Sequence, residues 1–67
     1  MYKIREISTG NFLNKPFIGK FSKEGFAFDF LENAKDKRDT LINYRHMPEN
    51  NLEIVKFNLN EVGVVKS

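Results

Sequence analysis

The sequence has no cysteine and no tryptophan, a single histidine, and two prolines and four glycines among 67 residues. Without cysteine, the chain can form neither a disulfide nor a thiolate metal site. The length predicts one small domain over residues 1–67, and a single core of that size supplies only about 3–5 kcal/mol. Oligomerisation or docking on a partner is therefore the expected source of further burial.

Long apolar runs are also missing, since none approaches the roughly 20 residues that a membrane helix needs. Residues 1–6 show no basic-then-apolar secretory pattern, so we expect a cytoplasmic protein without a membrane partner. Charged residues make up 30% and the net charge is +2, which by itself is too weak a bias to indicate nucleic-acid binding. The abundance of Asn, Lys, Ile and Phe is typical of an AT-rich genome, such as that of a low-GC bacterium or its phages.

What is present in excess is phenylalanine, with six of the seven between Phe12 and Phe30. Residues 17–21 and 26–30 predict the two arms of a β-hairpin joined by residues 22–25, with Phe21 opposite Phe26. Burial of the rings at 26, 28 and 30 would contribute about 1.5–3 kcal/mol each, which makes this stretch the expected centre of the core.

Hydrophobic periodicity predicts one helix, from Phe30 to Arg45, with Asp29 as its N-cap and Glu32 completing a capping box. Residues 2–5, 52–59 and 62–65 predict strands. Residues 52–59 begin apolar on both faces, which indicates a central strand or a strand covered by a partner. The predicted fold is α+β, a small mainly antiparallel sheet of three to four strands packed on one α-helix in the order ββαβ.

Few residues are suited to catalysis or metal binding. His46 has no second ligand at helical spacing. Glu32, Asp36 and Asp39 form an acidic row of the kind that usually faces water. No serine lies in a nucleophile elbow. We therefore expect no catalytic residue, no metal, no cofactor and no enzymatic activity.

Arg38 and Arg45 fall on the apolar side of the predicted helix and have two interpretations. Their stems can cover the sheet while the guanidinium groups reach water or pair with Glu6 or Glu53. Alternatively, they anchor a partner-binding surface through bidentate contacts. The candidate partner-binding residues are Arg38, Tyr44, Arg45, Met47, Leu52 and Ile54.

Lysines and rings also alternate near the expected hairpin, where Lys15, Lys20 and Lys23 flank Phe17 and Phe21. Such a pattern can bind single-stranded nucleic acid if the rings are exposed. In a domain this small, however, the rings are expected to be buried in the core. The leading hypothesis is a non-enzymatic protein-interaction module, such as a small phage- or mobile-element-encoded inhibitor of a larger host protein. The alternatives are a small nucleic-acid-binding protein and a structural homo-oligomer, with a homodimer as the simplest case.

Overall fold

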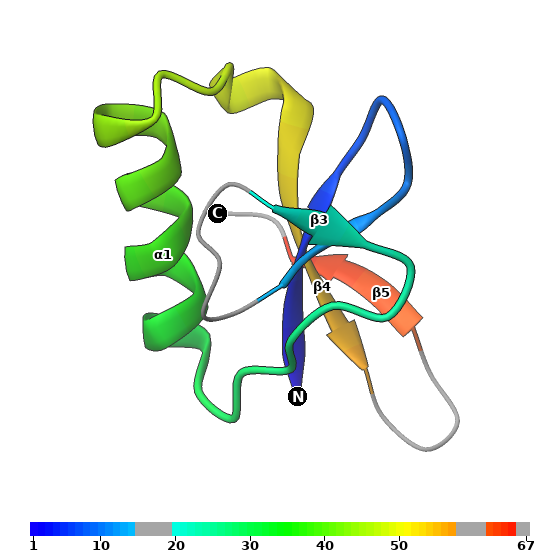
Figure 1. Cartoon of the computed structure of the whole chain (residues 1–67). Helices are drawn as coiled ribbons and strands as arrows, with labels where there is room; N and C mark the ends of the chain where they lie inside the picture. Colours follow the sequence, from blue (N-terminus) through cyan, green and yellow to red (C-terminus); the bar gives the residue numbers. More distant parts are fainter. Residues whose placement is uncertain (15–19, 58–61, 66–67) are drawn as a thin grey trace.

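The computed structural model describes residues 1–14, 20–57 and 62–65, and shows one helix packed against an antiparallel sheet (Figure 1). The elements in chain order are β1 (Tyr2–Glu6), β2 (Phe12–Leu13), β3 (Phe21–Ser22), α1 (Leu31–Tyr44), the 3-10 turn η1 (Glu49–Asn51), β4 (Leu52–Phe57) and β5 (Val62–Val65). The five strands lie in the spatial order β3-β2-β1-β4-β5. The α+β class is confirmed, but the predicted three to four strands and the ββαβ order are wrong, since three strands precede the helix and two follow it.

The core forms between α1 and the two central strands, β1 and β4. These strands pair in the register Ile4 opposite Ile54, so both isoleucines point to the face that the helix covers. Ala34 and Leu41 reach the same layer from α1 and are fully buried. The continuous core cluster consists of Ile4, Leu13, Phe28, Ala34, Leu41, Leu52 and Ile54.

Strand β4 is central in the sheet, which is one of the two outcomes that its apolar start predicted. It pairs with β1 on one side and β5 on the other, and Val55 is fully buried on the face away from Ile54. The structure assigns the strand to Leu52–Phe57, and the predicted extension through Leu59 lies outside the described residues. Both faces of the strand are covered, since Ile54 lies in the core cluster beneath α1 and Val55 is buried on the other face.

The predicted hairpin between residues 17–21 and 26–30 is wrong where the structure describes it. Phe21 pairs with Leu13 of β2, and Phe26–Phe30 is not a strand of the sheet. Instead, the Phe28 N–H donates to the Tyr2 carbonyl at 2.6 Å, and the Tyr2 N–H donates to the Phe28 carbonyl at 2.8 Å. Phe28 therefore enters the core by pairing with β1, and not by pairing with residues 17–21 in a local hairpin.

The helix begins and ends close to the predicted residues but is capped differently. Phe30 is the N-cap and has no side-chain cap hydrogen bond, so the capping box from Asp29 to Glu32 is not formed. Phe30 is also 68% exposed rather than part of the buried stripe. At the other end, His46 adopts φ 56°, and the Met47 N–H donates to the Leu41 carbonyl at 3.1 Å. The histidine therefore reverses the chain before Pro48.

Candidate interaction surfaces and a mixed aromatic cavity

The two edge strands of the sheet differ in length and in charge. At one edge, β3 is only two residues long and is flanked in the sequence by the exposed Lys20 and Lys23. Short strands and lysines are the usual means of protecting an edge from pairing with another chain. At the other edge, β5 has four residues, all valine or glycine, and carries no charge.

Strand β5 leaves its outer side open within the described part of the chain. Its register against β4 places Val64 beside Val55 and Val65 beside Ile54. Val65 is half-buried against the core, whereas Val64 is 48% exposed. Since β5 ends the sheet, alternate backbone N–H and C=O groups of this strand point outward.

The C-terminal end of α1 presents several of the predicted partner-binding residues. Tyr44 is 78% exposed and Arg45 is also exposed, while Met47 packs partly against the core. Arg38 is half-buried, with its Nε 3.7 Å from an Asp39 carboxylate oxygen. The structure therefore brings Tyr44 and Arg45 to the surface and uses Met47 partly as a packing residue.

The other two predicted partner-binding residues are in the interior. Leu52 is 6% exposed and Ile54 is 1% exposed, and both belong to the core cluster beneath α1. The expectation that they supply spare apolar surface is not met. The helix, which the sequence pattern did not place over this half of β4, covers them.

The carboxylates expected to pair with the helix arginines have other partners. Glu53 forms an ion pair with Arg5, which lies directly opposite it on β1. Glu6 accepts a hydrogen bond from the Thr9 hydroxyl at 2.7 Å. Cross-strand proximity therefore decides the pairing of Glu53, because opposite residues on neighbouring strands are closer than any helix residue.

Of the candidate nucleic-acid-binding residues, Lys20 and Lys23 are exposed and Phe21 packs partly against the core. Lys15 and Phe17 lie outside the described residues. A basic and aromatic cluster that the sequence pattern did not predict lies on the sheet face away from α1. There the Lys3 ammonium is 5.2 Å from the ring centroids of both Phe12 and Phe57.

The Lys3 cluster is an internal contact of the fold. The Lys3 Nζ donates to the Glu24 carbonyl at 2.6 Å, and the Phe12 and Phe57 rings meet edge-to-face at 5.7 Å. The lysine thus ties the turn after β3 to the sheet by a hydrogen bond and two cation–π contacts. The alternation of Lys3 and Ile4 in β1 is enough to predict that Lys3 lies on this face. Its ring partners could not be predicted in this way, because they lie 9 and 54 residues away in the sequence.

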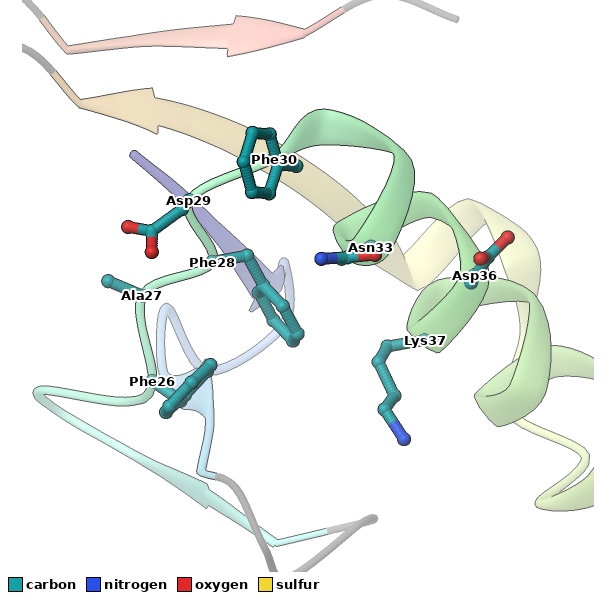
Figure 2. A pocket seen from close by; sticks show the side chains of 8 residues that line it. All are labelled: Phe26, Ala27, Phe28, Asp29, Phe30, Asn33, Asp36 and Lys37. Atoms are coloured by element: carbon teal, nitrogen blue, oxygen red, sulfur yellow. The ribbon is translucent and has the colours of Figure 1, made fainter.

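A partly open cavity of about 510 Å³ lies between the Phe26–Phe30 segment and the first half of α1. Its lining consists of Phe26, Ala27, Phe28, Asp29, Phe30, Asn33, Asp36 and Lys37. Figure 2 shows the Phe26 and Phe28 rings on one side and the Asn33 and Lys37 side chains on the other. The hollow is therefore lined by two segments that are consecutive in the chain, Phe26–Phe30 and the first half of α1.

Among the described residues, no group of three or more His, Asp or Glu side chains is arranged to hold a metal ion. In the same part of the chain, no helix has the length and apolar character needed to cross a membrane. Comparison of the chain with protein-family models, with curated proteins and with solved structures gave no match.

Proposed function

We propose that this protein is a non-enzymatic interaction protein that binds a larger protein by accepting one of its strands at the open edge of β5. The observation that carries this proposal is the contrast between the two sheet edges. β5 is longer and uncharged, with Val64 exposed, whereas β3 has two residues between lysines.

Strand addition suits a chain of this size because it needs little dedicated surface. Main-chain hydrogen bonds to β5 supply affinity, and side chains of the added strand alternate between the two sheet faces. Val64 offers one apolar contact on the face away from α1, where it neighbours Val55. A small modulator or inhibitor, such as one encoded by a phage or mobile element, would act by occupying an edge that its host target uses for another contact.

The exposed Tyr44 and Arg45 at the end of α1 are the alternative to the β5 edge as a binding surface for the same class of function. Tyrosine and arginine are enriched where interfaces concentrate binding energy. The added strand can also be β5 of a second copy of the chain. Two β5 edges related by a two-fold axis would then pair antiparallel and form a homodimer.

Nucleic-acid binding is less well supported by the described residues. Phe21 packs against the core, and the rings of Phe12 and Phe57 are engaged with Lys3. Stacking on bases requires free ring faces. Titration with single-stranded and duplex oligonucleotides at low salt tests this alternative, because phosphate binding weakens steeply as salt rises.

The test of the proposal compares three forms of the full chain in affinity capture from a low-GC bacterial lysate with mass spectrometry: the parent, Val64→Lys and Tyr44→Ala. A lysine at position 64 protects the β5 edge and leaves the core cluster unchanged, since Val64 is 48% exposed and does not belong to that cluster. We expect the parent and Tyr44→Ala to retain the same protein and Val64→Lys to lose it. Equal capture by all three forms would rule out the edge as the binding site.

Sizing at two concentrations addresses the homodimer. If β5 pairs with a second copy, the parent is dimeric at the higher concentration and Val64→Lys is monomeric. A parent that is monomeric at both concentrations and captures no protein contradicts the proposed function as a whole.

A further inference from the structure

Gly63 lies inside strand β5, and nothing in the described part of the chain requires a glycine there. Gly10 and Gly25 have φ of +76° and +69°, whereas the φ of Gly63 is not positive. A Cβ at position 63 would meet no atom of the described residues within 4 Å, so no neighbour occupies the space. A glycine weakens a strand, and in a strand it often marks a place where a ligand or another backbone approaches closely. The open position therefore indicates an approach from outside the chain.

The hydrogen bonds of β4 show which way the backbone of β5 points. The Phe57 N–H donates to the Met1 carbonyl at 2.8 Å, and the Met1 ammonium donates to the Phe57 carbonyl at 3.3 Å. Bonded residues alternate along an antiparallel strand, so the backbone groups of Lys56 face the other way, toward its partner Gly63. The N–H and C=O of Val64 therefore point outward from the sheet.

This orientation fixes what an added strand would meet at β5. A strand that runs antiparallel to β5 would exchange hydrogen bonds with Val64 and place its next residue beside Gly63. That residue and Gly63 would form a non-hydrogen-bonded pair, in which the two Cα atoms are only about 4.5 Å apart and the side chains are closest. The missing Cβ leaves room for a large side chain of the added strand to lie across the glycine.

Lys56 borders the open position on its inner side. It lies directly opposite Gly63 on β5 and directly opposite Tyr2 on β1. Lys56 and Gly63 are both exposed, so α1 does not cover this part of the sheet. Within the described residues, the Lys56 ammonium has no hydrogen bond, ion pair or ring contact. On the opposite face, Lys3 contacts two phenylalanine rings of the neighbouring strands, so this fold already pairs a lysine with rings across strands.

We propose that the strand accepted by β5 carries an aromatic side chain beside Gly63, with the ring over the glycine and against the Lys56 ammonium. This inference rests on the proposed function and adds the feature by which the edge selects its partner strand. A ring beside a glycine on an edge strand covers exposed backbone, and an ammonium is attracted to the negative face of a ring.

The same geometry argues for a strand of another protein as the occupant. Strand β5 consists of valines and one glycine, so a second copy of the chain supplies no ring at this edge. An acidic side chain would reach Lys56 but leave the glycine uncovered, and an exposed ion pair contributes little. The residue next to the ring would fall on the other face of the sheet, beside Val64, where a branched apolar side chain fits.

The test is a chemical-shift titration of the full chain, labelled with ¹⁵N, with two peptides as probes. One is acetyl-Ser-Thr-Val-Phe-Val-Thr-Ser-amide, whose sequence reads the same in both directions, and the other has Leu in place of Phe. We expect both peptides to produce saturable shifts at the amides of Gly63 and Val64. The Phe peptide should bind about two- to fivefold more tightly, the gain expected for an exposed cation–π contact.

Three variants assign this preference to particular residues. Lys56→Gln should remove the advantage of the Phe peptide and leave the affinity for the Leu peptide within about twofold. Lys23→Gln removes the same charge from an exposed lysine next to β3, at the other edge of the sheet, and should retain the advantage. Gly63→Val should also remove it, because the valine occupies the place of the ring. Dispersed spectra of each free variant show that it is folded before the titration begins.

The outcomes separate this inference from the proposed function. Equal binding of the two peptides by the parent overturns the inference and leaves the proposed function standing, because the edge still accepts a strand. A peptide with Glu at the central position that binds more tightly than the Phe peptide also overturns it, as does a preference for Phe that survives both Lys56→Gln and Gly63→Val. If no peptide shifts the β5 amides, the inference is rejected, and the lysate capture with Val64→Lys decides the proposed function separately.

Discussion

Gly25 lies directly against Phe12, so that a Cβ at position 25 would overlap the Phe12 Cβ and lie 3.1 Å from the Leu13 carbonyl oxygen. The glycine also has φ +69°, a conformation that other residues adopt with strain. This close approach lets the turn after β3 fold over the sheet, where Lys3 binds the Glu24 carbonyl. A single small residue thus joins the phenylalanine-rich segment to β2.

Replacement of Gly25 by alanine should therefore destabilise the protein by about 2 kcal/mol or more, through backbone strain and overlap with Phe12. Gly10→Ala is the matched control, since Gly10 has φ +76° and a Cβ there would meet nothing within 4 Å. It should cost only the strain, about 1 kcal/mol. Urea denaturation measures both losses of stability, provided that the slope of the unfolding free energy against urea concentration is the same as in the parent. Equal losses for the two variants would show that contact with Phe12 is unimportant.

Phe28 and Phe30 are two residues apart but differ in burial, at 4% and 68% exposed. Phe28→Ala should cost about 3–5 kcal/mol, enough to unfold much of so small a domain. Phe30→Ala should change the unfolding free energy by less than about 0.5 kcal/mol. Circular dichroism during thermal and urea denaturation provides the comparison. A large loss from Phe30→Ala would mean that its ring is buried in solution.

The ion pair between Arg5 and Glu53 predicts a charge-swap rescue. Arg5→Glu and Glu53→Arg each place like charges opposite one another on β1 and β4. Each single variant should lose about 1 kcal/mol, and the double variant should recover most of it. The side chains are 31% and 20% exposed, so salt should reduce this coupling without removing it. Losses that simply add in the double variant would contradict a direct pair.

His46 provides a prediction of increased stability. Its φ of 56° is a left-handed conformation that favours glycine at a helix end. His46→Gly should raise the unfolding free energy by about 0.5–1 kcal/mol, while His46→Ala should not. Urea midpoints of the three proteins test this. A loss of stability in the glycine variant would indicate that the imidazole makes a contribution larger than the backbone strain.

Part of the candidate site could be predicted from the sequence. The helix ends at Tyr44, one residue before the predicted end at Arg45, and the final strand at Val62–Val65 matches the predicted range. The interior positions of Leu52 and Ile54 could not be predicted, because apolar residues on a strand can meet either a helix or a partner. The cavity was not predicted either, because its lining combines the Phe26–Phe30 segment with side chains of α1.

The sequence by itself determined the elements whose signal is local and periodic: the helix at Leu31–Tyr44 and the strands β1, β4 and β5. Tertiary structure alone decided the pairing of Tyr2 with Phe28, the two-residue strands β2 and β3, and the exposure of Phe30. Two residues are too few to show a period, and a phenylalanine is equally apolar wherever it lies. Whether a phenylalanine is buried depends on which distant strand its segment pairs with, and that pairing forms only together with the rest of the core.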